Sequence, residues 1–165
     1  MTRRAREYLS SVTLVITGDD LDPDYVSRRL SLRPDRTWRK GDERSIGPRA
    51  YKYPWGGWKR FGDRKVKDKY LEEQLQYWVS LLTGRRNALR AFQKREWSCV
   101  LSCFISTDGT ASIVLPADFQ RELMDLGVDI EISMFAGDRD AANKGAAPDG
   151  DHGVAPAGRR VSRRG

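Results

Sequence analysis

Three segments of this chain alternate apolar and polar residues one by one, and this pattern limits the fold more than any other feature. The segments are 11–17, 97–106 and 129–134. A period of two with one polar side is typical of strands that are buried on one face only. Strands of a doubly wound parallel sheet are apolar on both faces. We therefore predict an α/β (α+β) fold: a single small domain with a mainly antiparallel sheet and helices on one face.

Capping residues and apolar spacing predict three helices and a short continuation. Asp22 is placed to cap the first helix, with Pro23 at its first position. Gly84 and Gly127 follow the last apolar positions of the other two, as glycines that end helices often do. The predicted helices run from Pro23 through Leu30, from about 68 to 83 with a continuation through Leu89 and Phe92, and from Pro116 to Leu126.

A faint internal repeat relates the start of the first helix to the start of the last. Leu21–Tyr25 reads Leu-Asp-Pro-Asp-Tyr, and Leu115–Phe119 reads Leu-Pro-Ala-Asp-Phe. The repeat is compatible with two halves of a ferredoxin-like split βαβ arrangement. It is equally compatible with two helices that follow the same capping rules.

Turn signals predict how the strands are connected. Asp108-Gly109 predicts a hairpin after the strand 97–107, with Ile105 opposite Ile113. The stretch 41–50 is predicted as a surface loop. It leads into an edge strand, since an edge tolerates the proline and glycines that follow.

Composition separates a folded domain from its flanks. Apolar residues make up 39% of the 165 residues and charged residues 32%, which suits one globular domain. The periodic patterns fill residues 8–136. Residues 1–7 are predicted as a flexible N-terminus. Residues 137–165, dominated by Gly, Ala, Asp, Pro and Arg, are predicted as a disordered basic C-terminal tail.

No segment has the character of a membrane span or of a secretory signal. A span requires roughly 18 or more consecutive apolar residues, and the chain has no such stretch. The apolar run Val12–Ile16 is also shorter than the roughly 7–15 residues at the core of a signal peptide. We therefore predict a cytoplasmic protein with no membrane contact.

Residues for nucleophilic or acid–base catalysis are scarce. The single histidine, His152, lies in the predicted tail, where no third group would hold it beside a nucleophile. Cys99 and Cys103 alternate with serines and are predicted as reduced residues on the apolar side of their strand. We therefore predict no catalytic residue.

An acidic cluster lies around the start of the first helix. It consists of Asp19, Asp20, Asp22 and Asp24. The spacing resembles the start of a calcium-binding loop, but Tyr25 and Ser31 stand where that loop needs Gly and Glu. Helix capping and the positive end of the helix dipole account for Asp22 and Asp24. Capping is favoured over a divalent-cation site, and neither a metal nor a cofactor is predicted.

The basic, aromatic segment 33–69 is the main functional signal. Its 13 Lys and Arg outnumber its 5 Asp and Glu by more than the +7 net charge of the whole chain. Cations contact phosphates or carboxylates, and flat rings stack on nucleic-acid bases. The candidate binding residues are Trp38, Arg39, Lys40, Tyr51, Tyr53, Trp55, Trp58, Lys59 and Arg60.

The same segment has a structural interpretation. A small domain needs to bury aromatic side chains, so at least some of these rings are expected in the core. Lys52 and Arg60 would then protect an exposed strand edge from aggregation.

Several short motifs follow one another in a distinctive order. They are Val12–Ile16 with Gly18–Pro23, Leu32–Pro34 with Arg39–Asp42, Trp55 with Trp58, and the strand Ile130–Phe135. In this order they resemble the bacterial domain of unknown function 4279 family, over about residues 8–136. The resemblance implies a small α/β fold and a bacterial origin. It implies no reaction and no catalytic residues, because the family has no assigned activity.

The leading functional hypothesis is a non-enzymatic binding module that uses the basic aromatic segment. The expected partner is an acidic protein, such as a toxin or a regulator; by analogy, some small α/β bacterial proteins accompany toxins as immunity factors. The second hypothesis is a single-stranded RNA or DNA binder with the same residues. A carboxylate- or metal-dependent enzyme is the third. A homodimer formed by edge-strand pairing is also compatible with the pattern.

Overall fold

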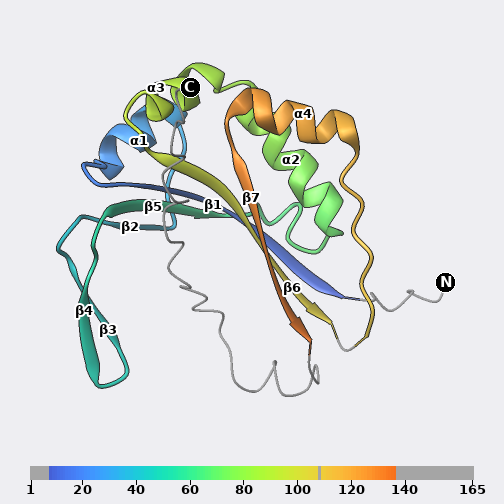
Figure 1. Ribbon diagram of the computed structural model, residues 1–165, viewed down its shortest axis with the longest axis horizontal. Helices are drawn as coiled ribbons and strands as arrows, with labels where there is room; N and C mark the ends of the chain where they lie inside the picture. Colours follow the sequence, from blue (N-terminus) through green and yellow to red (C-terminus); the bar gives the residue numbers. More distant parts are fainter. Residues whose placement is uncertain (1–7, 108, 137–165) are drawn as a thin grey trace, which may run out of the picture.

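Five strands form a mixed sheet in the order β2-β5-β1-β6-β7, and the helices lie on one face of it (Figure 1). The structure, a computed structural model, describes residues 8–107 and 109–136. The elements are β1 (Leu9–Gly18), α1 (Pro23–Leu30), β2 (Arg36–Trp38), β3 (Glu43–Ile46), β4 (Arg49–Lys52), β5 (Gly56–Phe61), α2 (Leu71–Thr83), α3 (Arg86–Gln93), β6 (Ser98–Thr107), α4 (Ala117–Leu126) and β7 (Asp129–Ala136). The predicted α+β fold class is confirmed.

The connections around β1 determine the topology. β5 and β6 both pair with β1 in the antiparallel sense, so they run parallel to each other with β1 between them. They are joined through α2 and α3, which makes one split βαβ unit. β6 and β7 are adjacent parallel strands joined through α4. β1 and β2 are likewise parallel, with β5 between them, and are joined through α1. The split arrangement is therefore present twice, in the order β2-β5-β1-β6 of a ferredoxin-like fold, beside an ordinary βαβ crossover.

The helices begin and end where their capping residues indicate. The Asp22 carboxylate accepts a hydrogen bond of 3.2 Å from the Asp24 backbone N–H, and Pro23 starts α1. Gly127 ends α4 in the left-handed conformation, at φ +64°. α2 starts at Leu71, three residues later than about 68, because its N-cap is Tyr70.

The core forms between the helices and the helix-facing side of β1 and β6. Val12, Leu14 and Ile16 are at most 1% exposed, and α2 covers them with an apolar stripe. β5 pairs with β1 only as far as Thr13. At Val12, the next residue of β1, two side chains of α2 form the hydrogen bonds that a neighbouring strand would otherwise provide. The Gln74 side-chain oxygen accepts from the Val12 N–H at 3.1 Å, and the Trp78 indole N–H donates to the Val12 carbonyl at 3.3 Å.

Both cysteines are buried and neither forms a disulfide, as predicted. Burial raises the pKa of Cys99 and of Cys103 to about 12. Because the thiolate is the nucleophile, both thiols should stay unreactive well above neutral pH. We expect no labelling by iodoacetamide in the native protein at pH 8 and labelling of both thiols in urea, measured by intact-mass spectrometry. Fast labelling of native protein would contradict this burial.

The predicted hairpin after β6 is wrong. β6 already has β1 on one side and β7 on the other, so the next segment has no free edge to join. The described residues 109–116 contain no strand. Ala111, Ile113 and Leu115 instead pack against the core along an extended connection to α4. Asp108 itself lies outside the described residues.

Two further predictions are corrected between residues 41 and 61. The stretch 41–50 is not a plain loop, since it contains β3 and the first half of β4, which form a separate two-stranded sheet. β5 is not an edge strand, because it lies between β2 and β1. Its first residue is a glycine because a Cβ at Gly56 would lie 2.7 Å from the Leu21 carbonyl oxygen. The flexibility predicted for residues 1–7 and the disorder predicted for 137–165 concern segments outside the described residues.

Candidate functional site

The hairpin formed by β3 and β4, residues 43–52, extends away from the main sheet (Figure 1). We call it the hairpin arm. All four residues of β4 are exposed, and Arg44 pairs with Tyr51 across the two strands. Two backbone hydrogen bonds continue the ladder below the arm. They run from the Gly41 N–H to the Tyr53 carbonyl at 2.8 Å and from the Tyr53 N–H to the Asp42 carbonyl at 3.0 Å.

Trp38 and Tyr53 form a stack at the base of the arm. Their ring centroids are 5.0 Å apart and their planes differ by 24°. Trp38 is 7% exposed, and its indole also lies over Gly57 of β5. A Cβ atom at Gly57 would be 2.0 Å from the indole Cζ2, so only glycine lets the ring lie there. The stack therefore joins the arm to the edge of the main sheet.

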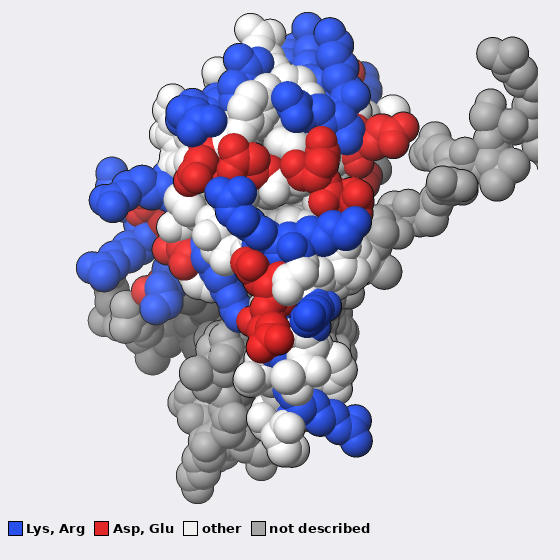
Figure 2. Space-filling model, turned by 90° about the vertical axis from the view of Figure 1, so that its left-hand side faces the viewer, with Lys and Arg blue, Asp and Glu red and all other residues white. Residues whose placement is uncertain are grey.

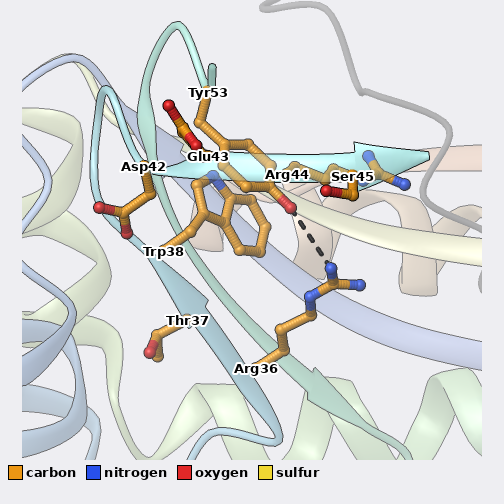
Figure 3. A pocket seen from close by; sticks show the side chains of 8 residues that line it. All are labelled: Arg36, Thr37, Trp38, Asp42, Glu43, Arg44, Ser45 and Tyr53. Atoms are coloured by element: carbon orange, nitrogen blue, oxygen red, sulfur yellow. Dashed lines mark hydrogen bonds between the residues drawn. The ribbon is translucent and has the colours of Figure 1, made fainter. Parts of the chain in front are cut away.

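The stack borders a cavity of about 300 Å³, which we call the arm-base pocket (Figure 3). Its lining residues are Arg36, Thr37, Trp38, Asp42, Glu43, Arg44, Ser45 and Tyr53. An Arg36 guanidinium N–H donates to the Tyr53 hydroxyl at 3.4 Å, and the Arg44 guanidinium lies 6.0 Å from the centre of the Tyr53 ring. The volume is at the lower end of the range of small-ligand sites.

One buried polar group beside the pocket lacks a partner. The Trp38 indole N–H is buried and has no hydrogen-bond acceptor within the described part of the chain. A buried donor without an acceptor costs about 1–3 kcal/mol. The pocket is thus lined by aromatic rings, two guanidinium groups and the two carboxylates of Asp42 and Glu43, with the buried Trp38 N–H beside it. The guanidinium groups can donate to an acceptor oxygen, and the carboxylates balance their charge.

Arg39 and Lys40 contact the acidic cluster rather than the arm. Arg39 lies 3.3 Å from an Asp22 oxygen and 3.4 Å from an Asp24 oxygen, and Lys40 contacts Asp19. On the face shown in Figure 2, Lys and Arg side chains lie among Asp and Glu side chains. Exposed pairs of this kind contribute about 0–1 kcal/mol each. This face is therefore mixed in charge rather than uniformly basic.

Trp58 belongs to the core. It is fully buried, and its indole N–H donates to the Ser27 hydroxyl at 3.0 Å. The expectation that some rings pack inside is thereby confirmed, and Trp58 is withdrawn as a binding residue. Trp55 is half-buried just before β5. Lys59 pairs with Val15 and Arg36 in the sheet, and Arg60 donates to the Arg33 carbonyl.

The described arm and pocket lie within a region that matches a known family. The sequence model of the family described as Domain of unknown function (DUF4279) matches residues 6–136. The chain belongs to this family. No curated protein and no solved structure matches the chain. The family description of this DUF4279 domain assigns no activity, so its function has to be argued from its own residues.

The sequence prediction included only two of the eight residues that line the arm-base pocket of this DUF4279 domain, Trp38 and Tyr53. Arg36 and Arg44 were outside the predicted set, although both lie in the basic segment. A signal was present for Arg36, since it stands two residues before Trp38 and therefore shares its side of a strand. No comparable signal places Arg44 beside Tyr53, because that contact depends on the hairpin register.

Within 8–107 and 109–136, no group of three or more His, Cys, Asp or Glu side chains is arranged to hold a metal ion. None of the described helices combines the length and the apolar character that crossing a membrane requires.

Proposed function

We propose that this domain is a non-enzymatic binding module that holds an acidic segment of a partner protein with its hairpin arm and arm-base pocket. The observation that carries the proposal is the arm itself. It leaves the main sheet, exposes Arg49, Tyr51 and Lys52, and ends at a pocket with an unsatisfied indole N–H.

The form of the arm supports a role in contact with a partner. A two-stranded hairpin on its own is at best marginally stable in water, and a third strand or a packed surface usually supports it. The described strands of the main sheet do not pair with the arm. A partner laid along it would supply that support. Tyr51, which is 48% exposed, is of a residue type enriched in protein interfaces.

Charge favours an acidic partner. The arm carries Arg44, Arg49 and Lys52 against Glu43. Complementary charge increases the rate of encounter and selects the partner. Arginine binds carboxylates through paired hydrogen bonds, so Arg49, which is exposed on the arm, is suited to an acidic segment.

The state of the thiols and of the pocket carboxylate Asp42, which could otherwise act in catalysis, also favours a binding role. The thiols of Cys99 and Cys103 are buried, with pKa values raised to about 12. The Asp42 carboxylate at the pocket accepts a hydrogen bond of 2.6 Å from the Arg39 backbone N–H. This bond gives the carboxylate a structural role.

The proposal is tested with a fluorescein-labelled peptide rich in glutamate and a single-stranded oligonucleotide of equal charge. We expect the peptide to bind at low salt and the double variant Arg49→Glu/Lys52→Glu to weaken binding by about tenfold or more. The control is Arg64→Glu/Lys65→Glu, which makes the same charge change at exposed residues between β5 and α2. The control should bind within about twofold of the wild type.

The possible outcomes separate the hypotheses. Equal losses of peptide affinity in both double variants would mean that only the net charge of the protein matters. That result would contradict a binding site on the arm. Oligonucleotide binding without peptide binding would favour the nucleic-acid hypothesis. Absence of binding to either probe would contradict both.

A further inference from the structure

We propose that β7 pairs with β7 of a second copy of this chain, so that the two main sheets join edge to edge. β7 has β6 on one side, and among the described strands none pairs with its other side. Such an edge presents unpaired backbone N–H and C=O groups that readily pair with another strand. This inference is independent of the proposed function, because the arm lies beside the opposite edge of the sheet.

The two edges of the main sheet differ in how they are protected. Natural edge strands are usually kept short or carry lysine or proline. β2 is three residues long, which limits any pairing along it. β7 is eight residues long, and its sequence DIEISMFA contains no lysine, arginine or proline. The edge at β7 therefore lacks the lysine and proline that usually prevent association, and its two charged residues, Asp129 and Glu131, lie on the face opposite to Ile132.

An apolar stripe reaches this edge. Ile132 pairs with Cys103 and Met134 with Ile105, so both side chains lie on the helix-facing side of the sheet. Cys103 and Ile105 are fully buried, whereas Ile132 is 43% exposed and Met134 is 55% exposed. The apolar side of the sheet thus continues past β6 and ends uncovered. One more strand beside β7 would cover it.

A second copy fits this edge because β7 is complementary to itself. In an antiparallel pair, residues directly opposite each other share a face. With Ile132 opposite the Ile132 of the other copy, Ile130 lies opposite Met134. On the other face, Glu131 then lies opposite Ser133. Asp129 lies opposite Phe135 in the same register. No carboxylate lies directly opposite another, and the contact is the self-complementary kind that closes a symmetric dimer.

The test is the mass of the full chain in solution, measured by sedimentation and by light scattering over a wide concentration range. We expect a dimer of about twice 18.8 kDa at high concentration. Ile132→Lys and Ile132→Glu should each be monomeric, because like charges would then face each other. An equimolar mixture of the two variants should form dimers again, since opposite charges would pair. The control Met124→Lys changes a 77% exposed residue of α4 and should leave the dimer intact.

Three outcomes would overturn the proposal. They are a wild-type chain that is monomeric at every concentration, a Met124→Lys variant that dissociates equally, and a mixture of the two Ile132 variants that stays monomeric. The circular dichroism spectrum of each variant shows whether it is folded. Because Ile132 is partly exposed, both substitutions should leave the fold intact.

Discussion

Replacing Trp58 by alanine should lower the free energy of unfolding by about 3–5 kcal/mol. The indole is fully buried between β5 and α1, so its loss leaves a large cavity and leaves the Ser27 hydroxyl without its donor. Domains of this size are stable by only about 5–15 kcal/mol. Much of the stability should therefore be lost. Urea unfolding followed by circular dichroism measures the effect.

Tyr51→Ala is the matched control for the Trp58 substitution. Tyr51 also belongs to the aromatic segment, but it is 48% exposed on the arm. Its removal should change the free energy of unfolding by no more than about 0.5 kcal/mol. Similar effects of the two substitutions would contradict the division of this segment into a core residue and an arm residue.

Replacing Gly57 by alanine should destabilise the domain by about 1–3 kcal/mol, the usual effect of overpacking. The added methyl group would lie 2.0 Å from the indole of Trp38, which is held between β5 and Tyr53. The ring has to move, and the stack at the base of the arm has to open. Urea unfolding measures the stability, and tryptophan fluorescence should report the changed surroundings of the indole.

Gly84→Ala provides the comparison for Gly57→Ala. Gly84 follows α2 with ordinary helical dihedral angles, and a Cβ there would meet only the Leu81 carbonyl oxygen at 3.8 Å. The substitution should be neutral or slightly stabilising. A Gly57→Ala variant that is as stable as Gly84→Ala would mean that Trp38 does not lie across β5.

Much of the fold could be predicted because alternation and capping are local. The strands through Val12–Ile16 and Ile130–Met134, and the starts of α1 and α4, are recognisable within a few residues. Strand direction is different, because β7 alternates although it pairs with β6 in the parallel sense, whereas alternation is usual for antiparallel sheets. The segment 109–116 illustrates the limit. It alternates like a strand, but it packs on the core without a partner strand.

The candidate site was harder to predict because burial depends on register. Trp58 faces the helices because it pairs with Ile16, while Trp38 lies on the other face because it pairs with Gly57. Nothing within the basic segment distinguishes the two tryptophans. The partners of Arg39 and Lys40 lie at least 15 residues away in the sequence, in the acidic cluster. A local count of charge therefore overestimates how basic the folded surface is.

The most direct test of a binding site at the arm is an NMR titration of the ¹⁵N-labelled full chain with the glutamate-rich peptide. The account predicts the largest shift changes in residues 41–53 and in the indole N–H of Trp38, which has no acceptor in the described structure. The indole N–H of Trp58 should stay unchanged, because it is buried and already donates to Ser27. Shift changes centred away from the arm, or none in residues 41–53 at saturating peptide, would contradict the account.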